Sequence, residues 1–375
     1  MRGPSASVRL MSTISSSLYE VRPNPSPRSE ADRAAILADP GFGVNFTDHM
    51  AVATWTADRG WHDREVGPYR PFELDPAAAV LHYAQEIFEG LKAYRHADDS
   101  IWLFRPEKNA DRFATSAERL ALPVLPTEDF LASIETLVST DRVWVPSGGE
   151  ACLYIRPFMF ASEVFLGVRP SKTVTYSCIA GPAGAYFSHG VQPVDIWLST
   201  NYVRSAPGGT GAAKTGGNYA ASLLPQQEAL QHGCEQVLFL DGAERKWLEE
   251  LGGMNVYLVT ASGELITPEL AGTILEGVTR DSVLALGAER GLTVVERKVA
   301  IDEVLRGIDD GTITEIFACG TAAVINPVGS IKTADGDHRV GDGTSGEHTD
   351  GLRRSLLDIQ YGRVEDTHGW MRRVC

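Results

Sequence analysis

A glycine-rich loop that presents one lysine limits what this chain can fold into more than any other segment does. The loop, residues 208–220, reads Gly-Gly-Thr-Gly-Ala-Ala-Lys-Thr-Gly-Gly-Asn-Tyr-Ala. Glycine allows positive φ and has no side chain, so the backbone of such a loop can pass close to a bulky ligand. Because an apolar, helix-forming stretch follows, we expect Lys214 to lie where a loop runs into a helix and to face a bound cofactor.

Two phosphate-binding motifs are similar to this loop, but neither fits it. A P-loop has glycine directly before its lysine, where this chain has Ala213. The dinucleotide pattern G-x-G-x-x-G also fails, because Gly209 and Gly211 are followed by Lys214 at the last position. A nucleotide-binding protein is therefore disfavoured, whereas a flexible surface turn with a solvated lysine remains an alternative for the segment taken alone.

The composition favours small molecules as ligands. The 375 residues are 43% hydrophobic, which allows large cores and two domains, and the net charge is −15 with a pI of 5.1. Nucleic acids and anionic membranes favour basic surfaces, so neither is expected as a partner. No apolar run approaches the roughly 18 residues that span a bilayer, and the five cysteines show no paired spacing. We expect a cytoplasmic protein without disulfides or a bound metal.

The order of predicted elements indicates a mixed α/β, or α+β, protein. In the first half, strands are expected at 100–104, 151–160 and 172–179, and a helix at 107–120. In the second half, the expected strands are 193–199, 235–240, 255–260, 293–299 and 313–318, and the expected helices are 218–232, 275–290, 302–308 and 352–359. The Gly/Pro/Ala stretch 181–190 marks the boundary between the halves.

This pattern predicts four segments. Residues 1–35 are expected to be a disordered or poorly matched extension, 36–183 a smaller N-terminal α/β domain, 184–192 a linker, and 193–375 a larger C-terminal cofactor-binding domain. Residues 1–18 superficially resemble an organellar transit peptide, but a disordered or untranslated extension, with Met11 as the true start, fits their composition better. The acidic stretch 334–350 fits no calcium-loop spacing and is expected to be a solvated loop.

A lysine in such a loop can form a Schiff base, and the commonest protein-bound carbonyl partner is pyridoxal phosphate. This cofactor needs a phosphate site. Val278 and Thr279 stand at the start of a predicted helix, where unpaired N–H groups and the helix dipole favour an anion. Thr321 follows a predicted strand, and Arg112 lies in the first-half helix. Taken singly, Thr279 is better explained as an N-cap and Arg112 as a solvated or salt-bridged side chain.

The cofactor's pyridine nitrogen also needs an acidic partner, and two adjacent glutamates are available. A carboxylate from Glu249 or Glu250 would keep the ring nitrogen protonated and let the ring accept electrons. Adjacent residues of an extended segment face opposite sides, so only one can face the cofactor and the other is expected to be solvent-exposed. Spacing alone does not choose between them, and two solvated glutamates remain an alternative.

Taken together, these segments resemble branched-chain amino acid aminotransferases of the fold type IV pyridoxal phosphate class. One stretch, 81–94, reads Leu-His-Tyr-Ala-Gln-Glu-Ile-Phe-Glu-Gly-Leu-Lys-Ala-Tyr. The likeness also covers residues 43–50, 104–122, 154–157, 184–187, the lysine loop, 250–255, 277–280, 320–322 and 358–362. It spans all of the chain except residues 1–35 and implies a two-domain fold similar to that of D-amino acid aminotransferase.

Carried over position by position, the resemblance implies which residues bind the cofactor. Lys214 would be the Schiff-base lysine, Tyr219 the partner of the phenolic oxygen, and Glu250 the partner of the ring nitrogen. The phosphate-binding positions fall on Arg112, Val278, Thr279 and Thr321, and Arg204 matches an arginine near the phosphate.

The resemblance also implies one pocket that admits both a branched apolar amino acid and glutamate. The aromatic wall positions fall on Phe42, Tyr83, Phe88 and Tyr186, where burial of a leucine side chain would contribute about 1.5–3 kcal/mol. Backbone groups of Gly253 and Ala322 would bind the substrate α-carboxylate.

Tyr154 and Arg156 match a pair that, in the family, reaches the pocket from the neighbouring subunit. Arg156 would bind the distal carboxylate of glutamate or 2-oxoglutarate. A homodimer is implied through this pair alone.

The implied activity is a ping-pong transamination of leucine, isoleucine and valine with 2-oxoglutarate, which gives branched 2-oxo acids and L-glutamate, with Lys214 as the proton carrier. D-Amino acid aminotransferases and aminodeoxychorismate lyases are the nearest alternatives within the fold class. Gly253 replaces a threonine of some members, which leaves a backbone contact only. Ala323 and Asn326 stand where some members have a redox Cys-x-x-Cys, so thiol switching is not expected.

Overall fold

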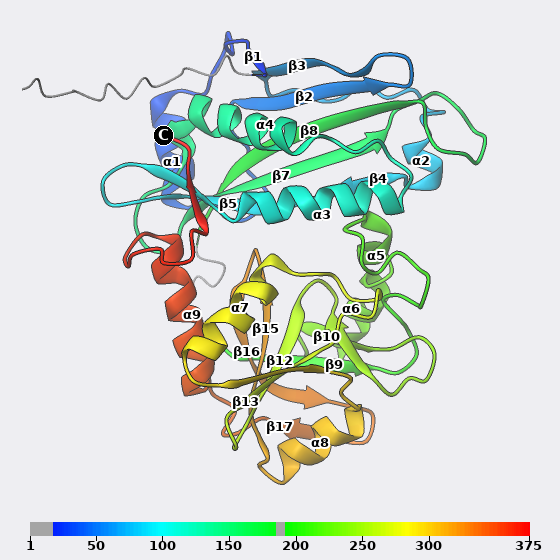
Figure 1. Ribbon diagram of the computed structural model, residues 1–375, viewed down its shortest axis with the longest axis vertical. Helices are drawn as coiled ribbons and strands as arrows, with labels where there is room; N and C mark the ends of the chain where they lie inside the picture. Colours follow the sequence, from blue (N-terminus) through cyan, green and yellow to red (C-terminus); the bar gives the residue numbers. More distant parts are fainter. Residues whose placement is uncertain (1–17, 185–191) are drawn as a thin grey trace, which may run out of the picture.

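The computed structural model describes residues 18–184 and 192–375 and contains two mixed β-sheets, one above the other in Figure 1. The first sheet has the order β1-β3-β2-β8-β7-β5-β6-β18, and β4 pairs with β7. Its strands are β1 (Glu20–Val21), β2 (His49–Thr56), β3 (Gly60–Pro68), β4 (Glu86–Phe88), β5 (Leu91–Arg95), β6 (Ile101–Phe104), β7 (Cys152–Ala161), β8 (Thr173–Ala183) and β18 (Met371–Arg373).

Two long helices, α3 (Pro106–Arg119) and α4 (Thr127–Thr140), cover one face of this sheet (Figure 1). In α3, the helical spacing brings Ala110, Phe113 and Ala117 onto the buried side, where they join the main core of the first sheet. Proline at the first position suits the helix start, because its missing N–H would be unpaired there in any case. The short helices α2 (Val80–Tyr83) and η1 (Arg142–Trp144) lie between the strands in the chain.

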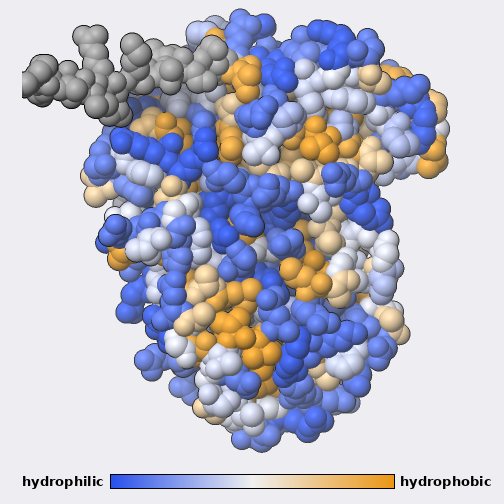
Figure 2. Space-filling view, viewed as in Figure 1, coloured by the Kyte–Doolittle hydropathy of each residue, from blue (hydrophilic) through white to orange (hydrophobic). Residues whose placement is uncertain are grey.

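The second sheet has the order β11-β10-β9-β16-β15-β12-β13-β14, and β17 pairs with β16. Its strands are β9 (Val194–Ser199), β10 (Gln236–Leu240), β11 (Leu248–Leu251), β12 (Asn255–Thr260), β13 (Glu264–Pro268), β14 (Thr293–Arg297), β15 (Ile313–Gly320), β16 (Val324–Lys332) and β17 (Asp337–Arg339). The inner strand β12 is buried along its whole length. Side chains of α7 (Val278–Glu289) and α9 (Glu347–Gln360) share one core with it, and side chains of α8 (Ile301–Asp309) share another (Figure 1). Figure 2 shows mostly hydrophilic side chains on this face of the molecule, with apolar ones gathered over the second sheet.

The prediction of one continuous helix over 218–232 is wrong. The structure has α5 (Gly216–Ala220) and α6 (Leu223–Gln231) instead. Pro225 explains the break, since proline has no N–H and its ring would collide with the carbonyl four residues earlier in a continuous helix. Gly233, with φ of +66°, ends the segment as expected.

The glycine- and proline-rich stretch predicted at 181–190 begins inside a strand. Residues 181–183 belong to β8 and pair with β7. A side chain at Gly181 would collide with the backbone oxygen of Asn45, so glycine is needed here for close packing rather than for a turn. Residues 185–191, which include Tyr186 and most of the predicted linker 184–192, lie outside the described residues.

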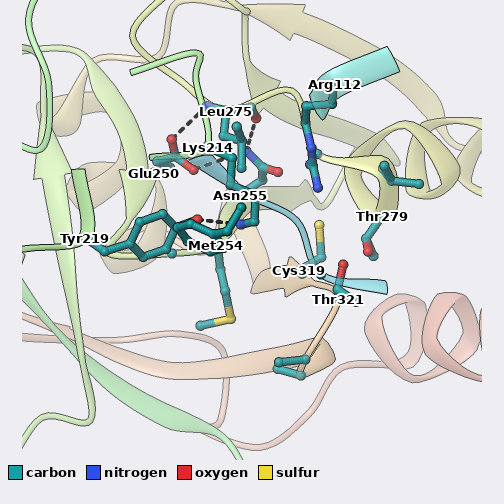
Figure 3. A pocket seen from close by; sticks show the side chains of 18 of the residues that line it. Arg112, Lys214, Tyr219, Glu250, Met254, Asn255, Leu275, Thr279, Cys319 and Thr321 are labelled. Carbon is teal, nitrogen blue, oxygen red and sulfur yellow. Dashed lines mark hydrogen bonds between the residues drawn. The ribbon is translucent and has the colours of Figure 1, made fainter. Parts of the chain in front are cut away.

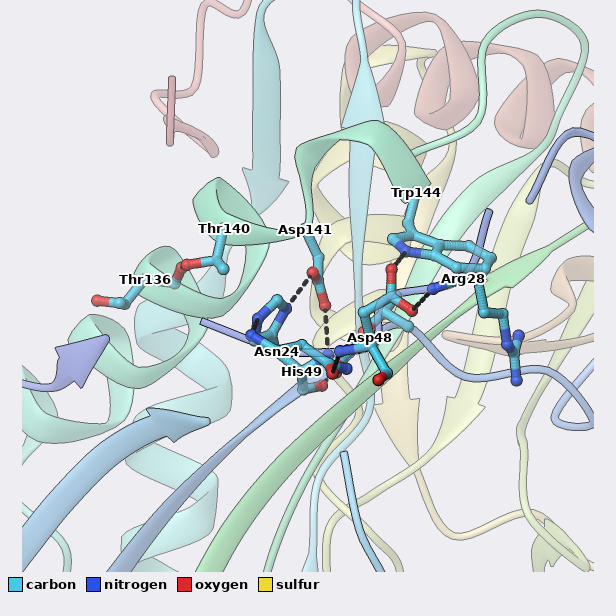
Figure 4. Close-up of polar contacts among 10 residues, drawn as sticks. Asn24, Arg28, Asp48, His49, Thr136, Thr140, Asp141 and Trp144 are labelled. Carbon is cyan, nitrogen blue, oxygen red and sulfur yellow. Dashed lines mark hydrogen bonds and ion pairs between the residues drawn. The ribbon is translucent and has the colours of Figure 1, made fainter. Parts of the chain in front are cut away.

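Residues 18–35 are ordered, contrary to the disorder that is one of the two alternatives predicted for 1–35. Within this range, β1 pairs with β3, Tyr19 is 1% exposed, and α1 (Glu30–Ala38) begins at an N-cap serine. A polar cluster holds the segment to the sheet (Figure 4): Asn24 N donates to His49 Nε2 (3.0 Å), and Arg28 N donates to Asp48 Oδ1 (3.0 Å). Backbone hydrogen bonds to distant side chains give no periodic signal in the sequence, so composition alone suggested disorder.

The chain returns to the first sheet at its C-terminus, where β18 pairs with β6 and the marked end lies beside that sheet (Figure 1). Apart from β18, the strands of the first sheet all precede residue 184, and those of the second sheet all follow residue 192. The stretch 334–350, expected as loop, contains β17 and the start of α9. Among the described residues, no helix is long and apolar enough to cross a membrane, and no three His, Cys, Asp or Glu side chains are grouped to hold a metal ion.

Candidate active site

A cavity of about 290 Å³ lies between the two sheets and collects side chains from both (Figure 3). It is lined by thirteen of the residues predicted to bind cofactor or substrate: Phe42, Phe88, Arg112, Tyr154, Arg156, Lys214, Tyr219, Glu250, Gly253, Val278, Thr279, Thr321 and Ala322. Residues far apart in the sequence thus meet in one cavity. Arg204 and Tyr83 do not line it, and Tyr186 lies outside the described residues.

Lys214 projects into the cavity from a loop that is fixed on both sides. Its amine donates to the Tyr219 hydroxyl (2.6 Å) and lies 4.8 Å from the centre of the Phe88 ring. Its backbone N–H donates to Ser116 Oγ (2.9 Å), and its carbonyl accepts from the N–H of Phe88 (3.0 Å). Within the loop, Asn218 donates to the carbonyls of Thr210 and Ala213. The backbone of Lys214 is therefore held by the first sheet while its side chain faces the second.

Glu250 forms one side of the cavity and is 1% exposed. Its Oε1 accepts from the N–H of Leu275 (2.9 Å) and pairs with Arg204 (2.9 Å). Burial raises the pKa of Glu250 to about 7, against the opposing positive charge of Arg204. A carboxyl group in this state can share a proton with a basic ring nitrogen.

Glu249 is not solvent-exposed, contrary to the expectation for the second of the two glutamates. It is 4% exposed, and burial raises its pKa. The two side chains do differ in direction, since Glu250 lines the main cavity and Glu249 lines a separate one with Thr273 and Ile274. The segment after β13, which includes Thr273 and Ile274, covers Glu249, and the sequence does not reveal this contact.

Arg204 lies beside Glu250 rather than at the phosphate end where the resemblance placed it. The side chain is buried, and its NH1 group also donates to the carbonyls of Gly211 (3.3 Å) and Thr273 (3.2 Å). These contacts join the lysine loop to the segment that precedes α7. Arg204 therefore supports Glu250 from behind and does not reach the cavity.

The opposite side of the cavity is suited to a phosphate. In Figure 3, Arg112, Thr279 and Thr321 lie across the cavity from Glu250. Helix α7 begins at Val278 with Gly277 as N-cap, so Thr279 is not the capping residue, and the N–H groups of the first turn, which have no partner within the helix, can bind an anion. A side chain at Gly277 would collide with Asn255 Oδ1, which accounts for glycine at that position.

Arg112 is both salt-bridged and part of the cavity. Its Nε and NH2 groups donate to the two carboxylate oxygens of Glu89 (2.7 and 2.8 Å), and NH1 donates to the carbonyl of Glu276 (2.9 Å). Burial of Glu89 opposes its ionisation, but the charge and hydrogen bonds of Arg112 outweigh this and lower the pKa of Glu89. Glu89 is not among the residues predicted from the sequence. It lies in the quoted stretch 81–94, but its partner is 23 residues away and the burial of both becomes visible only in the fold.

The remaining wall is aromatic and carries one cation. Phe42 meets Tyr154 edge-on with ring centres 5.0 Å apart, and the guanidinium of Arg156 lies 4.8 Å from the Phe88 ring centre. Arg156 NH2 donates to the Tyr154 hydroxyl (3.1 Å). Gly253 is close enough to the Tyr219 ring that a Cβ would lie 3.3 Å from it.

The expectation that Tyr154 and Arg156 come from a neighbouring subunit is wrong, since both line the cavity of the same chain as Lys214. Strand β7 places them there: Lys92 of β5 pairs with Tyr154, and the Phe88–Phe158 pair of β4 and β7 lies next to Arg156. Tyr83 lies elsewhere, on α2, where it is 40% exposed and its hydroxyl donates to the carbonyl of Leu166. The argument for a dimer from this pair therefore no longer holds.

Known proteins match both the sequence and the fold. The family described as "Amino-transferase class IV" matches residues 86–331. A probable branched-chain-amino-acid aminotransferase of Streptomyces coelicolor is 56% identical over 353 residues, which cover 94% of this chain and 97% of that protein. The branched-chain-amino-acid aminotransferase of Mycolicibacterium smegmatis is 55% identical over 360 residues, 95% of this chain and 98% of that protein.

Among solved structures, the branched-chain amino acid aminotransferase of Escherichia coli matches with a TM-score of 0.72 and 29% identity, over 87% of this chain and 100% of that one. The branched-chain amino acid aminotransferase of Thermobaculum terrenum, solved "in PLP-form (holo-form)", matches with a TM-score of 0.69 and 25% identity, over 86% of this chain and 98% of that one. Each of these matches thus covers at least 86% of this chain. The chain therefore belongs to the class IV aminotransferases, within the group of branched-chain-amino-acid aminotransferases.

Proposed function

We propose that this chain transfers the amino group of leucine, isoleucine or valine to 2-oxoglutarate with pyridoxal 5'-phosphate bound in the cavity between the sheets. The observation that carries the proposal is the position of Lys214. Its amine lies inside that cavity, 2.6 Å from the Tyr219 hydroxyl, between a buried carboxyl group and a helix N-terminus. These are the three partners that the aldehyde, the ring nitrogen and the phosphate of this cofactor require.

The residues on the phosphate side fit a bound phosphate group. The first-turn N–H groups at Val278 and Thr279 have no partner within their helix, and the hydroxyls of Thr279 and Thr321 border the cavity. Within the part of the chain that the structure describes, neither hydroxyl has a hydrogen-bond partner. When bound, the cofactor supplies an aldehyde that exchanges with the substrate amino group and a ring that accepts the electron pair left at Cα.

The residues on the other side hold and move protons. Glu250, with its raised pKa and its ion pair to Arg204, would keep the ring nitrogen protonated. The Tyr219 hydroxyl would hold the phenolic oxygen. The Lys214 amine, once free, would take the proton from Cα of the amino acid and return it in the opposite half-reaction. Because the Lys214 backbone is fixed at both N–H and carbonyl, only the side chain has to move.

The substrate is proposed to lie against the aromatic wall. Phe42, Phe88 and Tyr154 would pack on a branched side chain, and Arg156 would pair with the distal carboxylate of glutamate. Backbone groups of Gly253 and Ala322, which line the cavity, would bind the α-carboxylate. Tyr83 and Arg204 do not line the cavity, and Tyr186 lies outside the described residues, so their predicted roles stay proposals.

A replacement of Lys214 tests the function. Wild-type protein purified with its cofactor should change its visible absorption on addition of L-leucine and recover it on addition of 2-oxoglutarate, whereas D-alanine should have no effect. Lys214→Ala should lower turnover by at least about a thousandfold, because the proton carrier is lost. Lys108→Ala, which removes an exposed lysine of α3, is the matched control. Wild-type turnover in Lys214→Ala, or a faster response to D-alanine than to L-leucine, would contradict the proposal.

We also propose that the protein works as a homodimer in the cytoplasm. Support for self-association is an exposed apolar patch beside the first sheet, on α2 and the segments 72–74 and 164–168, which comprises Phe72, Leu74, Leu81, Tyr83, Val164, Leu166 and Val168. Four of these side chains, Leu81, Val164, Leu166 and Val168, are more than half exposed, at 58%, 58%, 59% and 88%.

Support for a reducing compartment such as the cytoplasm is that all five cysteines are free thiols. Fractionation of cells tests this location.

A further inference from the structure

The phosphate side of the cavity has less positive charge than Arg112 suggests. A phosphate ester carries about −1.5 to −2 charges at neutral pH. Arg112 is paired through two hydrogen bonds with Glu89, which is 0% exposed. The pair as a whole is neutral, and only part of the guanidinium faces the cavity. A second cation on this side would add to the attraction that the N-terminus of α7 exerts on the phosphate.

Lys92 of β5 is a cation close to the phosphate side of the cavity. The residue is 8% exposed, and its ammonium donates to the carbonyl of Ala322 (3.0 Å). Among the described residues, no carboxylate oxygen lies within 4.0 Å of it. The acid whose pKa it helps to lower, Glu150, is held by Arg353 instead. The positive charge of Lys92 is thus not cancelled by a direct ion pair.

A small second cavity places Lys92 directly behind the phosphate side. This cavity of about 20 Å³ shares four wall residues with the main one, namely Val278, Thr279, Gly320 and Thr321. Its other wall includes Lys92, Asn109 and Gln360, and Gln360 Oε1 is buried without a hydrogen-bond partner among the described residues. The cavity is too small for an organic ligand. It has room for one water, which Lys92, Asn109 and Gln360 can hydrogen-bond, and one shared wall separates these side chains from the main cavity.

We infer that Lys92 is a cofactor-positioning residue that acts on the phosphate through the turn at 320–323. Its hydrogen bond to Ala322 fixes this turn, so that Thr321 faces the cavity, and its charge favours the phosphate across the shared wall. Lys92 belongs to the first sheet and the turn to the second, so the same contact also holds the two sheets together at the cofactor. The inference rests on the proposed use of pyridoxal phosphate.

The test compares two forms of the cofactor that differ only in the phosphate. Full-length, cofactor-free protein is titrated with pyridoxal 5'-phosphate and with pyridoxal, and binding is followed by absorbance. Lys92→Met should weaken binding of the phosphorylated form about tenfold and leave binding of pyridoxal within about twofold. Lys92→Arg should restore most of the loss, and Lys108→Met, which removes an exposed lysine of α3, should change neither.

A second variant tests the inference independently, in case Lys92→Met does not fold. Gln360→Glu places a carboxylate beside Lys92 without removing it and should give the same phosphate-specific loss. Equal weakening of both ligands, or no weakening, in these two variants would overturn the role of Lys92. Wild-type protein that binds neither ligand would instead overturn the proposed cofactor, so the two failures are distinguishable.

Discussion

Arg156 shows how one side chain can meet two kinds of substrate. Its guanidinium lies against the rings of Phe88 (4.8 Å) and Tyr154 (5.4 Å), and its Nε is buried without a partner among the described residues. A guanidinium presents a flat, weakly hydrated face and a rim of donors. An apolar substrate side chain can therefore pack on the face, while a carboxylate can bind the rim without any rearrangement of the wall.

Replacement of Arg156 should consequently separate the two substrates. Arg156→Leu should lower kcat/KM for glutamate about 10- to 100-fold, because hydrogen bonds to a charged group contribute about 1.5–3 kcal/mol. Leucine should lose no more than about threefold, since apolar packing is kept. Single-turnover rates of the two half-reactions measure the difference, and Arg156→Lys, which keeps the charge but not the flat face, should lie between. Equal losses for both substrates would refute the assigned role.

At the level of residues, local sequence patterns predict the role of a side chain in the site. They do not predict a contact whose partner is distant in the sequence. Lys214 follows from its glycine-rich loop, and Val278 and Thr279 follow from a predicted helix start, whereas Tyr219 follows only from the family resemblance; all four line the cavity. Glu89 and the burial of Glu249 depend on contacts with α3 and with the segment after β13. The same holds for Arg204, whose partner Glu250 is remote in sequence.

At the level of elements, the segment before α1 is held by a buried polar cluster rather than by apolar packing alone. Asp141, which follows α4, accepts from the backbone N–H of His49 (2.9 Å) and lies 2.7 Å from its Nδ1 (Figure 4). Because Nε2 accepts from the N–H of Asn24, the ring carries its proton on Nδ1, toward Asp141. Asp48 in turn accepts from Trp144 Nε1 (2.8 Å). Asp141, at the end of α4, thus fixes the orientation of the His49 ring, and this ring binds the N-terminal segment at Asn24.

Loss of Asp141 should loosen this segment and destabilise the first sheet. Asp141→Ala leaves two buried donors of His49 unpaired, which should lower the free energy of unfolding by about 3 kcal/mol. Urea titration measures this loss, and limited proteolysis should show new cleavage between residues 18 and 38. Asp39→Ala, at the exposed end of α1, is the control and should change stability by less than about 0.5 kcal/mol. Unchanged stability of Asp141→Ala would contradict the role of the cluster.

Long periodic elements were predictable, and short or interrupted ones were not. The helix predicted at 107–120 differs from α3 by one residue at each end, because its apolar spacing and its flanking prolines act locally. The break between α5 and α6 depends on Pro225, which a pattern of apolar residues does not reveal. The strands β17 and β18 have three residues each, and only their pairing with β16 and β6 makes them strands.

For the whole molecule, the two sheets meet at the cavity and are joined around it by polar contacts. Arg105, before α3, donates to Ser282 of α7 (2.7 Å), and Arg112 donates to the carbonyl of Glu276. Lys92 adds the contact to the turn at 320–323. Each of these joins a residue of the first sheet or its helices to the half that holds Lys214, so the arrangement of the cavity depends on how the halves dock.

The apolar patch beside the first sheet predicts that two copies of the chain associate. Its two segments already lie together, since Phe165 N donates to Ala77 O (3.0 Å) and Tyr83 donates to Leu166. Sedimentation of wild-type protein should give twice the chain mass of 40.6 kDa. The double variant Leu166→Asp/Val168→Asp should give one chain mass, because two charges would have to be buried unpaired. Val143→Asp, at a site of η1 that is 51% exposed, should leave the dimer intact. A dimer that survives the double variant would place the interface on another surface.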